Sequence, residues 1–498
     1  MNSVHIQQAS AEQTLELLWS RIRQRGDLPG FSKVVSAILN AMQAEDDREF
    51  NMTKTVLSDP ALTQRVLKLA NSAMYSVFGQ NINTVSKAVI VLGTEAIGHL
   101  ALGLRLIDGL STVSSESEIA RSEMEKAVLA GHIARQVAST ANTRDIEEAV
   151  VCSMLHSLGR LMTTFYLPEQ WEQIQEYCAA HGVEESAAAY AVLGLNLDEL
   201  GRLIAKRWGF PPTLINSMQS LRPKASDEPL THSDWLAAVS TMSSACAGVL
   251  READGEPSKE IAEIAGEYTN MLGLDPEQLV GAIQVAHHTA KEEAVISKQE
   301  KPAAATKKPV VVKPAPRLNE DVSQLAKGVA DMQGISNSAN SGQMVTMALE
   351  TLYKGLGLSR AVVFLRSPDQ TRYLGRMCFG DGVQELIPRL SFNSAYQPDV
   401  FHASLANDKI IFVENAQAAS FISKLPRWWR ETFPTTRSFI VLPLTLKRQA
   451  IGFMYGDWDQ SVPEFKRESL EIPALENLRA IVSSAIEQRR KVEPNWMI

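Results

Sequence analysis

The sequence predicts a multidomain protein with an all-α N-terminal module and an α/β C-terminal module built on a central antiparallel sheet. Three observations predict this division. Up to residue 296, apolar residues recur at three- and four-residue spacing, which is the period of amphipathic helices. After residue 319, short apolar runs bounded by glycine, proline and charged residues are typical of strands. Between the two patterns lies a segment rich in proline and lysine.

The helix that begins at Pro60 is the most informative predicted element. Asp59 can accept the free amide protons of its first turn, and Pro60 at the first helical position loses no hydrogen bond. An apolar stripe follows on one face, made of Leu62, Val66, Leu69, Ala70 and Ala73. An ordinary buried helix explains the stripe, but not the motif Asp-Pro-Ala-Leu followed by Leu-Ala-Asn-Ser-Ala-Met-Tyr.

That pair of motifs resembles the HDOD family, the HD-related output domains of bacterial signalling proteins. Further matching segments are residues 28–35, 85–97, 154–161 and 200–211, although Ser32 stands where the family opening Leu-Pro-x-x-Pro has its second proline. The resemblance covers roughly residues 15–220, and it implies an all-helical HD-like module. Residues 1–14 are then a tail, and residues 221–296 supply accessory helices that we expect to pack on the HDOD core.

The resemblance also locates the position at which HD hydrolases bind their metals. Those enzymes use a histidine, a His-Asp pair and further His or Asp ligands to hold divalent metals that activate water. In this sequence the matching positions are Lys126, His156, Ser157 and Leu197. An ammonium repels a cation, a neutral hydroxyl is a poor replacement for a carboxylate, and leucine offers no ligand atom. We therefore expect no metal, no other cofactor and no catalytic residue in this module.

The alternative is a metal-dependent phosphodiesterase or phosphohydrolase with a remodelled HD site. Nine histidines are present, and the spacing of His132 and His156 would suit a site of the HD type. However, no carboxylate lies close to His132 in the sequence, and the rings of His287 and His288 would point about 100° apart on a helix. The number of ligands therefore disfavours an enzyme.

Size and composition indicate an intracellular multidomain protein. The chain has 498 residues, which corresponds to roughly three folding units. Its four cysteines are scattered without a pairing pattern, which favours a reducing compartment. The first residues show neither a basic nor an apolar signal region, and no apolar run is long enough to span a bilayer. We expect a cytoplasmic location and no membrane partner.

Residues 297–318 are predicted to form an extended linker, because their closely spaced prolines leave no room for a stable helix. The segment is basic, but it lacks the interleaved aromatic residues on which nucleic-acid bases stack. The chain as a whole is acidic, with a formal net charge of −8. We therefore expect no nucleic-acid partner, and we expect trypsin to cut first between Lys298 and Arg317, leaving two folded fragments.

After the linker, residues 319–492 are expected to form the α/β module. An amphipathic helix over residues 343–354 is stopped by Gly355. The predicted strands are residues 361–365, 410–413, 439–444 and 451–456. The last two strands, joined by a basic turn, resemble the closing hairpin of GAF domains, and a final helix over residues 474–488 fits the same fold.

GAF-like domains commonly sense a small molecule or act as dimerisation modules, and the resemblance implies the same two roles here. The sequence lacks the motif of cyclic-nucleotide binding, Cys378 is not followed by the histidine of a bilin site, and His402 alone could not hold a haem or iron. The candidate pocket or interface residues are Tyr373, Phe379, Arg427, Trp428, Trp429 and Tyr455. For the two tryptophans, the alternative is that one fills the core while the other lies on the surface.

The expected function is non-catalytic bacterial signal transduction, in which the GAF-like sensor modulates protein–protein interactions of the degenerate HD module. The expected partners are other signalling proteins. A small-molecule ligand in the GAF-like domain and a homodimer are both compatible with the sequence, which identifies neither the signal nor the downstream partner.

Overall fold

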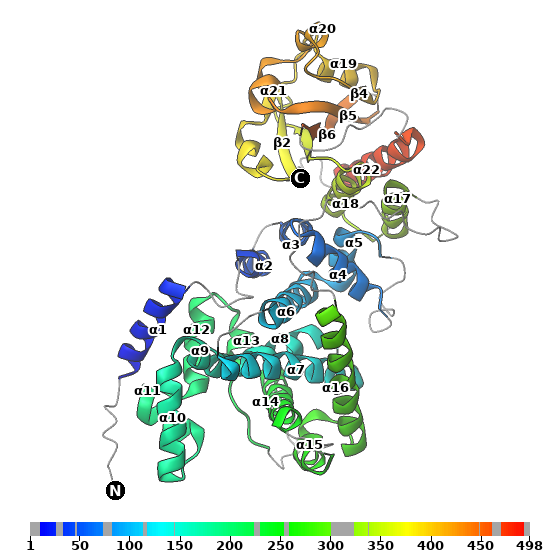
Figure 1. The fold of residues 1–498 in the computed structure, drawn as a ribbon. Helices are drawn as coiled ribbons and strands as arrows, with labels where there is room; N and C mark the ends of the chain where they lie inside the picture. The colour runs from blue at the N-terminus through cyan, green and yellow to red at the C-terminus, as the bar shows by residue number, and fades with distance from the viewer. Residues whose placement is uncertain are drawn as a thin grey trace. The chain divides into compact units, whose positions relative to one another are not determined.

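The computed structural model describes residues 10–25, 33–44, 47–72, 82–112, 117–143, 145–223, 230–252, 258–299, 323–336, 338–447, 449–460 and 470–492. The chain divides into two compact units, and Figure 1 labels their helices and most of their strands. The first unit holds Met1–Ala44 and Glu95–Val310, and the second holds Glu45–Thr94 and Val311–Ile498.

The described residues of the first unit are mainly helical. In chain order the helices are α1 (Ala11–Arg25), α2 (Lys33–Gln43), α6 (Thr94–Thr112), α7 (Glu118–Thr140), α8 (Ile146–His156), α9 (Leu158–Tyr166), α10 (Pro168–His181), α11 (Glu185–Leu193), α12 (Leu197–Arg207), α13 (Pro212–Ser217), α14 (His232–Glu252), α15 (Ser258–Leu272) and α16 (Pro276–Gln299). The long helix α7 packs against α8, α14 and α16. Helix α14 also packs against α8 and α15. Helices α14 and α16 therefore cover the α7–α8 pair.

Local sequence explains where several of these helices begin. Asn196 and Glu199 form a capping box at the start of α12, in which the Glu199 N–H donates to Asn196 Oδ1 over 2.8 Å. Ser117 caps α7 by accepting a hydrogen bond from the Ala120 N–H. Pro168 occupies the first turn of α10, where its missing N–H costs nothing.

Helices α9 and α12 approach each other through glycine. A Cβ atom added to Gly159 would lie 1.9 Å from the Leu197 carbonyl oxygen, and one added to Gly201 would lie 2.9 Å from the Gly159 nitrogen. Glycine is therefore required for the two backbones to come this close. The contact holds Leu197 against the start of α9, beside the positions expected for the HD-type site.

The second unit combines helices with one antiparallel sheet. Its helices are α3 (Arg48–Leu57), α4 (Pro60–Ala70), α5 (Val85–Leu92), α17 (Gln324–Ile335), α18 (Ser341–Gly355), the 3₁₀ helix η2 (Val383–Arg389), α19 (Val400–Asn407), α20 (Ala419–Ile422), α21 (Arg427–Thr432) and α22 (Ile472–Val492). Its strands are β1 (Arg360–Arg366), β2 (Arg372–Phe379), β3 (Ser391–Asn393), β4 (Ile411–Val413), β5 (Thr436–Leu446) and β6 (Gln449–Asp459). They follow the order β3-β2-β1-β6-β5-β4, and the longest pairing, between β5 and β6, runs from Thr436↔Asp459 to Leu446↔Gln449.

Helices cover both faces of this sheet (Figure 1). Helix α18 contacts β1, β2 and β6, while α19 contacts β5 and β6. Val362 and Phe364 of β1 belong to an aromatic core that also contains Phe401 of α19 and Trp429 of α21. Because successive strand residues point to opposite faces, Val363 lies on the other side of the sheet. The aromatic core thus lies between the sheet and the α19–α21 layer.

The predicted fold class is confirmed, with a helical N-terminal region and a C-terminal region built on an antiparallel sheet. Asp59 caps α4 as expected, accepting from the Leu62 N–H over 3.0 Å. The predicted helices over 343–354 and 474–488 lie within α18 and α22. Strand β2 was missed because its outer positions carry polar residues, including Arg372 and Arg376, that break up the apolar run.

The compact units do not follow the domain boundaries expected from the sequence. Helices α3 to α5 fall inside the expected HDOD range of 15–220, yet they pack with the C-terminal residues, where both α3 and α5 contact α18. Helix α16 extends to Gln299, past the expected start of the linker at residue 297. The rest of that linker, residues 300–318, lies outside the described residues, as do residues 1–9 of the expected tail.

Within the described residues, no single helix has the length and apolar composition needed to cross a membrane, and only α5 together with the first part of α6 meets that test as a bent pair.

Candidate functional site

Three of the four expected HD-site positions come together in the first unit. His156 is the last residue of α8, Ser157 joins α8 to α9, and Leu197 is the first residue of α12. All three line one pocket of about 290 Å³. The other lining residues are Arg160, Glu185, Asp198, Thr241, Ser244 and Ala245.

His156 is the one residue among the four positions that commonly binds metals. Burial lowers the pKa of its imidazole, against the opposing effect of the nearby Asp198 carboxylate. The ring is therefore neutral at neutral pH. Within the described part of the chain, its Nδ1 atom has no hydrogen-bond partner. Glu185 and Asp198 also line the pocket, but among the described residues no three ligand atoms there lie within 4.8 Å of one another.

Lys126 joins the margin of this pocket through ion pairs. Its Nζ lies 3.3 Å from Glu123 Oε1, and Glu123 Oε2 lies 3.7 Å from Arg160 Nη1. Arg160 also donates to Glu185 through Nε over 3.1 Å and through Nη2. Two cations therefore stand at or beside the position where the hydrolases hold their metal. Each is paired with a carboxylate, Lys126 with Glu123 and Arg160 with Glu123 and Glu185, so these charges balance one another.

Arg160, Asp198 and Glu185 line the pocket around His156 but were not expected there from the sequence. Arg160 follows Ser157 by about one helical turn, and Asp198 directly follows Leu197, so both lie beside positions that the family resemblance had singled out. Glu185 begins α11, and only the tertiary structure brings it to Arg160.

A second group of metal-ligand residue types lies at the opposite end of α8. Asp145, Glu148 and His232 place ligand atoms within 4.8 Å of one another. His232 Nε2 lies 2.9 Å from Glu148 and Nδ1 lies 3.7 Å from Asp145, so its two ring nitrogens face different carboxylates. His156 follows Asp145 by eleven positions along α8, a distance of about 16 Å along the helix axis. The group therefore lies away from the position expected for the HD-type site.

The candidate pocket residues of the C-terminal domain lie mostly in its core. Those at most 4% exposed are Tyr373, Phe379, Trp429 and Tyr455. Trp428 is half-buried and stacks on Phe392, with ring centroids 4.9 Å apart, whereas Arg427 is exposed and pairs with Glu431 over 2.6 Å. The alternative from the sequence was that one tryptophan fills the core while the other lies on the surface. The structure is close to this, since Trp429 fills the core and Trp428 packs at its margin.

A hydrogen-bonded network explains why polar atoms are buried in this core. Asp457 is fully buried and accepts from Arg360 Nε over 2.9 and 3.1 Å, from Thr436 Oγ1 over 3.0 Å and from the Tyr455 hydroxyl over 2.8 Å. Trp429 Nε1 donates to that hydroxyl over 3.0 Å. Burial raises the pKa of Asp457, and Arg360 acts in the opposite direction. The network joins β1, β5, β6 and α21, so Trp429 and Tyr455 are structural residues.

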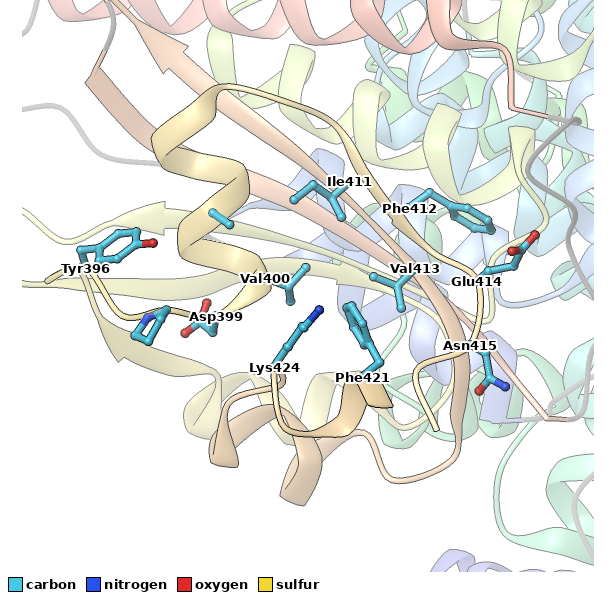
Figure 2. A pocket seen from close by; sticks show the side chains of 12 residues that line it. Tyr396, Asp399, Val400, Ile411, Phe412, Val413, Glu414, Asn415, Phe421 and Lys424 are labelled. Atoms are coloured by element: carbon cyan, nitrogen blue, oxygen red, sulfur yellow. The ribbon is translucent and has the colours of Figure 1, made fainter. Parts of the chain in front are cut away.

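A pocket of about 520 Å³ lies at the edge strand β4, and none of the six candidate residues lines it (Figure 2). Its apolar walls come from Val400, Val413 and Phe421, among others. Figure 2 shows Phe421 and Lys424 reaching toward Val400 and Val413, with Tyr396 at one end. Apolar walls with a few polar groups at the margin are typical of small-molecule sites.

His402, the histidine nearest this pocket, is occupied by structural contacts. Its Nδ1 lies 2.9 Å from Asp399 Oδ2, and its Nε2 lies 3.1 Å from the Asn393 carbonyl oxygen. Burial acts to lower the pKa of the ring, but the hydrogen bond and charge of Asp399 outweigh it, so the pKa is raised. The ring anchors the start of α19.

Comparison with protein families accounts for the helical region. Residues 28–222 match the family model of the HDOD domain. This chain contains an HDOD domain. The matched range includes His156, Ser157 and Leu197 as well as helices α3 to α5, so each compact unit holds part of the HDOD domain.

An uncharacterised protein of Treponema pallidum (strain Nichols) is 24% identical over 209 residues, which is 42% of this chain. That match covers 40% of the relative, so the chain spans about two fifths of the length of the curated relative it matches.

Similar solved structures fall into two groups. An HDOD domain protein of unknown function from Geobacter sulfurreducens is 18% identical, covering 57% of this chain and 98% of its own, with a TM-score of 0.41. A protein from Shewanella amazonensis SB2B, provisionally named a phosphohydrolase, is 24% identical, covering 56% and 97%, with a TM-score of 0.40. The GAF domain of an Acinetobacter phosphoenolpyruvate-protein phosphotransferase is 18% identical, covering 34% and 93%, with a TM-score of 0.27.

Proposed function

We propose that this HDOD protein is a non-catalytic bacterial signal-transduction protein. In this proposal the C-terminal domain senses a small molecule and modulates the association of the HDOD domain with other signalling proteins in the cytoplasm. The observation that carries it is the pocket at the HD-site position, which Ser157, Leu197 and Arg160 line. Lys126, at the fourth expected position, pairs with Glu123 beside Arg160. In this proposal the HDOD domain has no metal-activated water and acts by binding other proteins.

The pocket at β4 supports the sensing role. Two of its lining residues, Val400 and Val413, belong to the aromatic core, so a bound ligand would contact that core directly. None of the residues in the network of Asp457 lines the pocket. Its lining residues come from the α19 and α20 segments as well as from β4, and a ligand held between them would couple these elements. The formal net charge of −8 favours association with a basic partner surface.

The full chain is expected to carry no stoichiometric manganese, iron or zinc and to leave cyclic dinucleotides unhydrolysed. The reason is that the four HD-site positions supply one metal-ligand type, His156. Metal analysis of the purified protein and chromatography of a cyclic dinucleotide incubated with it give the two measurements. About one metal per chain, with hydrolysis abolished by His156→Ala, would contradict the proposal and support the metal-dependent phosphohydrolase instead. Loss of the metal in His232→Ala would assign it to the group at the other end of α8.

Replacing Ala403 by leucine is expected to reduce retention of a small molecule in the β4 pocket by tenfold or more, because the larger side chain fills part of the space. The measurement is mass spectrometry of compounds released when the purified full chain is denatured. The matched control is Ala419→Leu on α20, which does not line the pocket.

The compound identified in this way then tests the coupling. Addition of the compound should change the small-angle scattering of the full chain and its affinity for a partner. Identical scattering and identical affinity in both states would contradict the sensing role.

A further inference from the structure

Helix α5 begins against a buried carboxylate of the C-terminal domain. Glu350 of α18 is 3% exposed, and its Oε1 accepts from the Val85 N–H over 2.8 Å. Its Oε2 accepts from the Ser86 N–H over 2.8 Å and from the Ser86 hydroxyl. These amides belong to the first turn of α5, whose N–H groups have no partner inside the helix. Glu350 therefore caps α5 from outside, with its charge at the positive end of the helix dipole.

A second buried carboxylate holds the residues just before α5. Asp331 of α17 is 2% exposed and accepts from the Asn83 backbone N–H over 2.8 Å and from Asn83 Nδ2 over 2.9 Å. It also accepts from Thr84 Oγ1 over 3.1 Å and pairs with Lys87 Nζ over 3.0 Å. The two carboxylates together contact every residue from 83 to 87 through backbone or side-chain donors. Hydrogen bonds to charged groups are the strong class, which makes this a specific attachment.

Helix α3 adds to the same attachment. The Phe50 ring lies 5.4 Å from the ring of Phe379 at the end of β2. Lys54 Nζ donates to Gln384 Oε1 over 2.6 Å. The candidate residue Phe379 thus serves as a contact for α3.

We propose that α3, α4 and α5 form a docking element that the C-terminal domain holds through Asp331 and Glu350. The element then moves with that domain, although its sequence belongs to the HDOD domain. The chain leaves the docking element at Gly93, whose φ of +91° is a backbone conformation that glycine adopts readily. The residues that follow belong to the first unit. The docking needs no ligand, so it goes beyond the sensing role and does not depend on it.

The test uses the full chain nicked by trypsin in the linker between Lys298 and Arg317. The two wild-type halves are expected to elute together in size-exclusion chromatography at micromolar concentration. In Glu350→Gln, the amide NH₂ would face a backbone N–H in place of an acceptor. Together with Asp331→Asn, this should raise the dissociation constant of the halves on the order of 100-fold. The control is Glu431→Gln, which removes an exposed carboxylate of α21 and should behave as wild type.

Hydrogen exchange of the intact chain separates undocking from misfolding. Deuterium uptake over residues 82–92 should rise in the Glu350→Gln and Asp331→Asn variants while uptake over β5 and β6 stays at the wild-type level. Ser86→Ala, on the opposite side of the contact, should shift uptake in the same direction because it removes one donor to Glu350. Separation of the wild-type halves after nicking, or unchanged uptake over α5 in all three variants, would overturn the proposal.

Discussion

Replacing Arg360 by methionine is expected to destabilise the C-terminal domain by about 3–5 kcal/mol at neutral pH, because it leaves a fully buried carboxylate without its cation. Asp457 would keep hydrogen bonds from Thr436 and Tyr455, but neither carries a charge that could balance it. The measurement is the free energy of local opening of β5 and β6, obtained from hydrogen exchange of the full chain in increasing urea.

The pH dependence gives this prediction a second readout. Burial raises the pKa of Asp457 and Arg360 opposes that effect, so removing Arg360 raises the pKa of Asp457 further above its unfolded value near 3.9. A carboxyl with a higher pKa in the folded state binds its proton more tightly there, so the folded state gains stability as the pH falls. The deficit of Arg360→Met relative to wild type should therefore be smaller at pH 5 than at pH 7.

Arg427→Met serves as the matched control, because Arg427 forms an exposed pair with Glu431 on α21. Its stability should stay close to wild type at both pH values. A loss below about 1 kcal/mol in Arg360→Met, or an equal loss at both pH values, would show that Asp457 does not depend on Arg360 for its charge balance.

Gly159→Ala is expected to destabilise the HDOD helices by about 3 kcal/mol or more, since the added Cβ would lie 1.9 Å from the Leu197 carbonyl oxygen. The neighbouring atoms are backbone, so relief requires α9 and α12 to move apart. That movement would also open the pocket between His156 and Leu197. Thermal unfolding of the full chain and hydrogen exchange over α9 and α12 give the measurements.

Gly266→Ala on α15 is the matched control, because nothing lies within 4 Å of the added Cβ. Alanine has the higher helix propensity, so this variant should be as stable as wild type or more stable by up to about 1 kcal/mol. Equal stability of the two alanine variants would mean that α9 and α12 are not packed through Gly159.

Much of the fold follows from local sequence. Asp59 and Pro60 start α4 because a carboxylate and a residue without an N–H satisfy the first turn without help from distant residues. The runs that became β1, β5 and β6 are apolar enough to be recognised from sequence, since both faces of these central strands are covered. Strand β2 was harder to recognise, because polar residues alternate with its buried ones.

The candidate sites were predictable to different degrees. His156, Ser157 and Leu197 do meet in one pocket. They were chosen by resemblance to the HDOD family, and the fold of that family already brings these positions together. The C-terminal candidates were chosen for their aromatic rings, which fill cores at least as often as they line sites. The β4 pocket is built from ordinary residues such as Val400, Val413 and Phe421, and no local pattern marks them.

The sequence by itself determined the two fold classes and the start of α4, because each depends on residue type and short-range spacing. The tertiary structure alone decided that α3 to α5 pack with the C-terminal domain. Asp331 and Glu350 are separated from their partners by more than 240 residues of chain, and nothing in their local sequence distinguishes them from solvated helix carboxylates. Their role appears only when folding buries them against the first turn of α5, where unpaired amides need an acceptor.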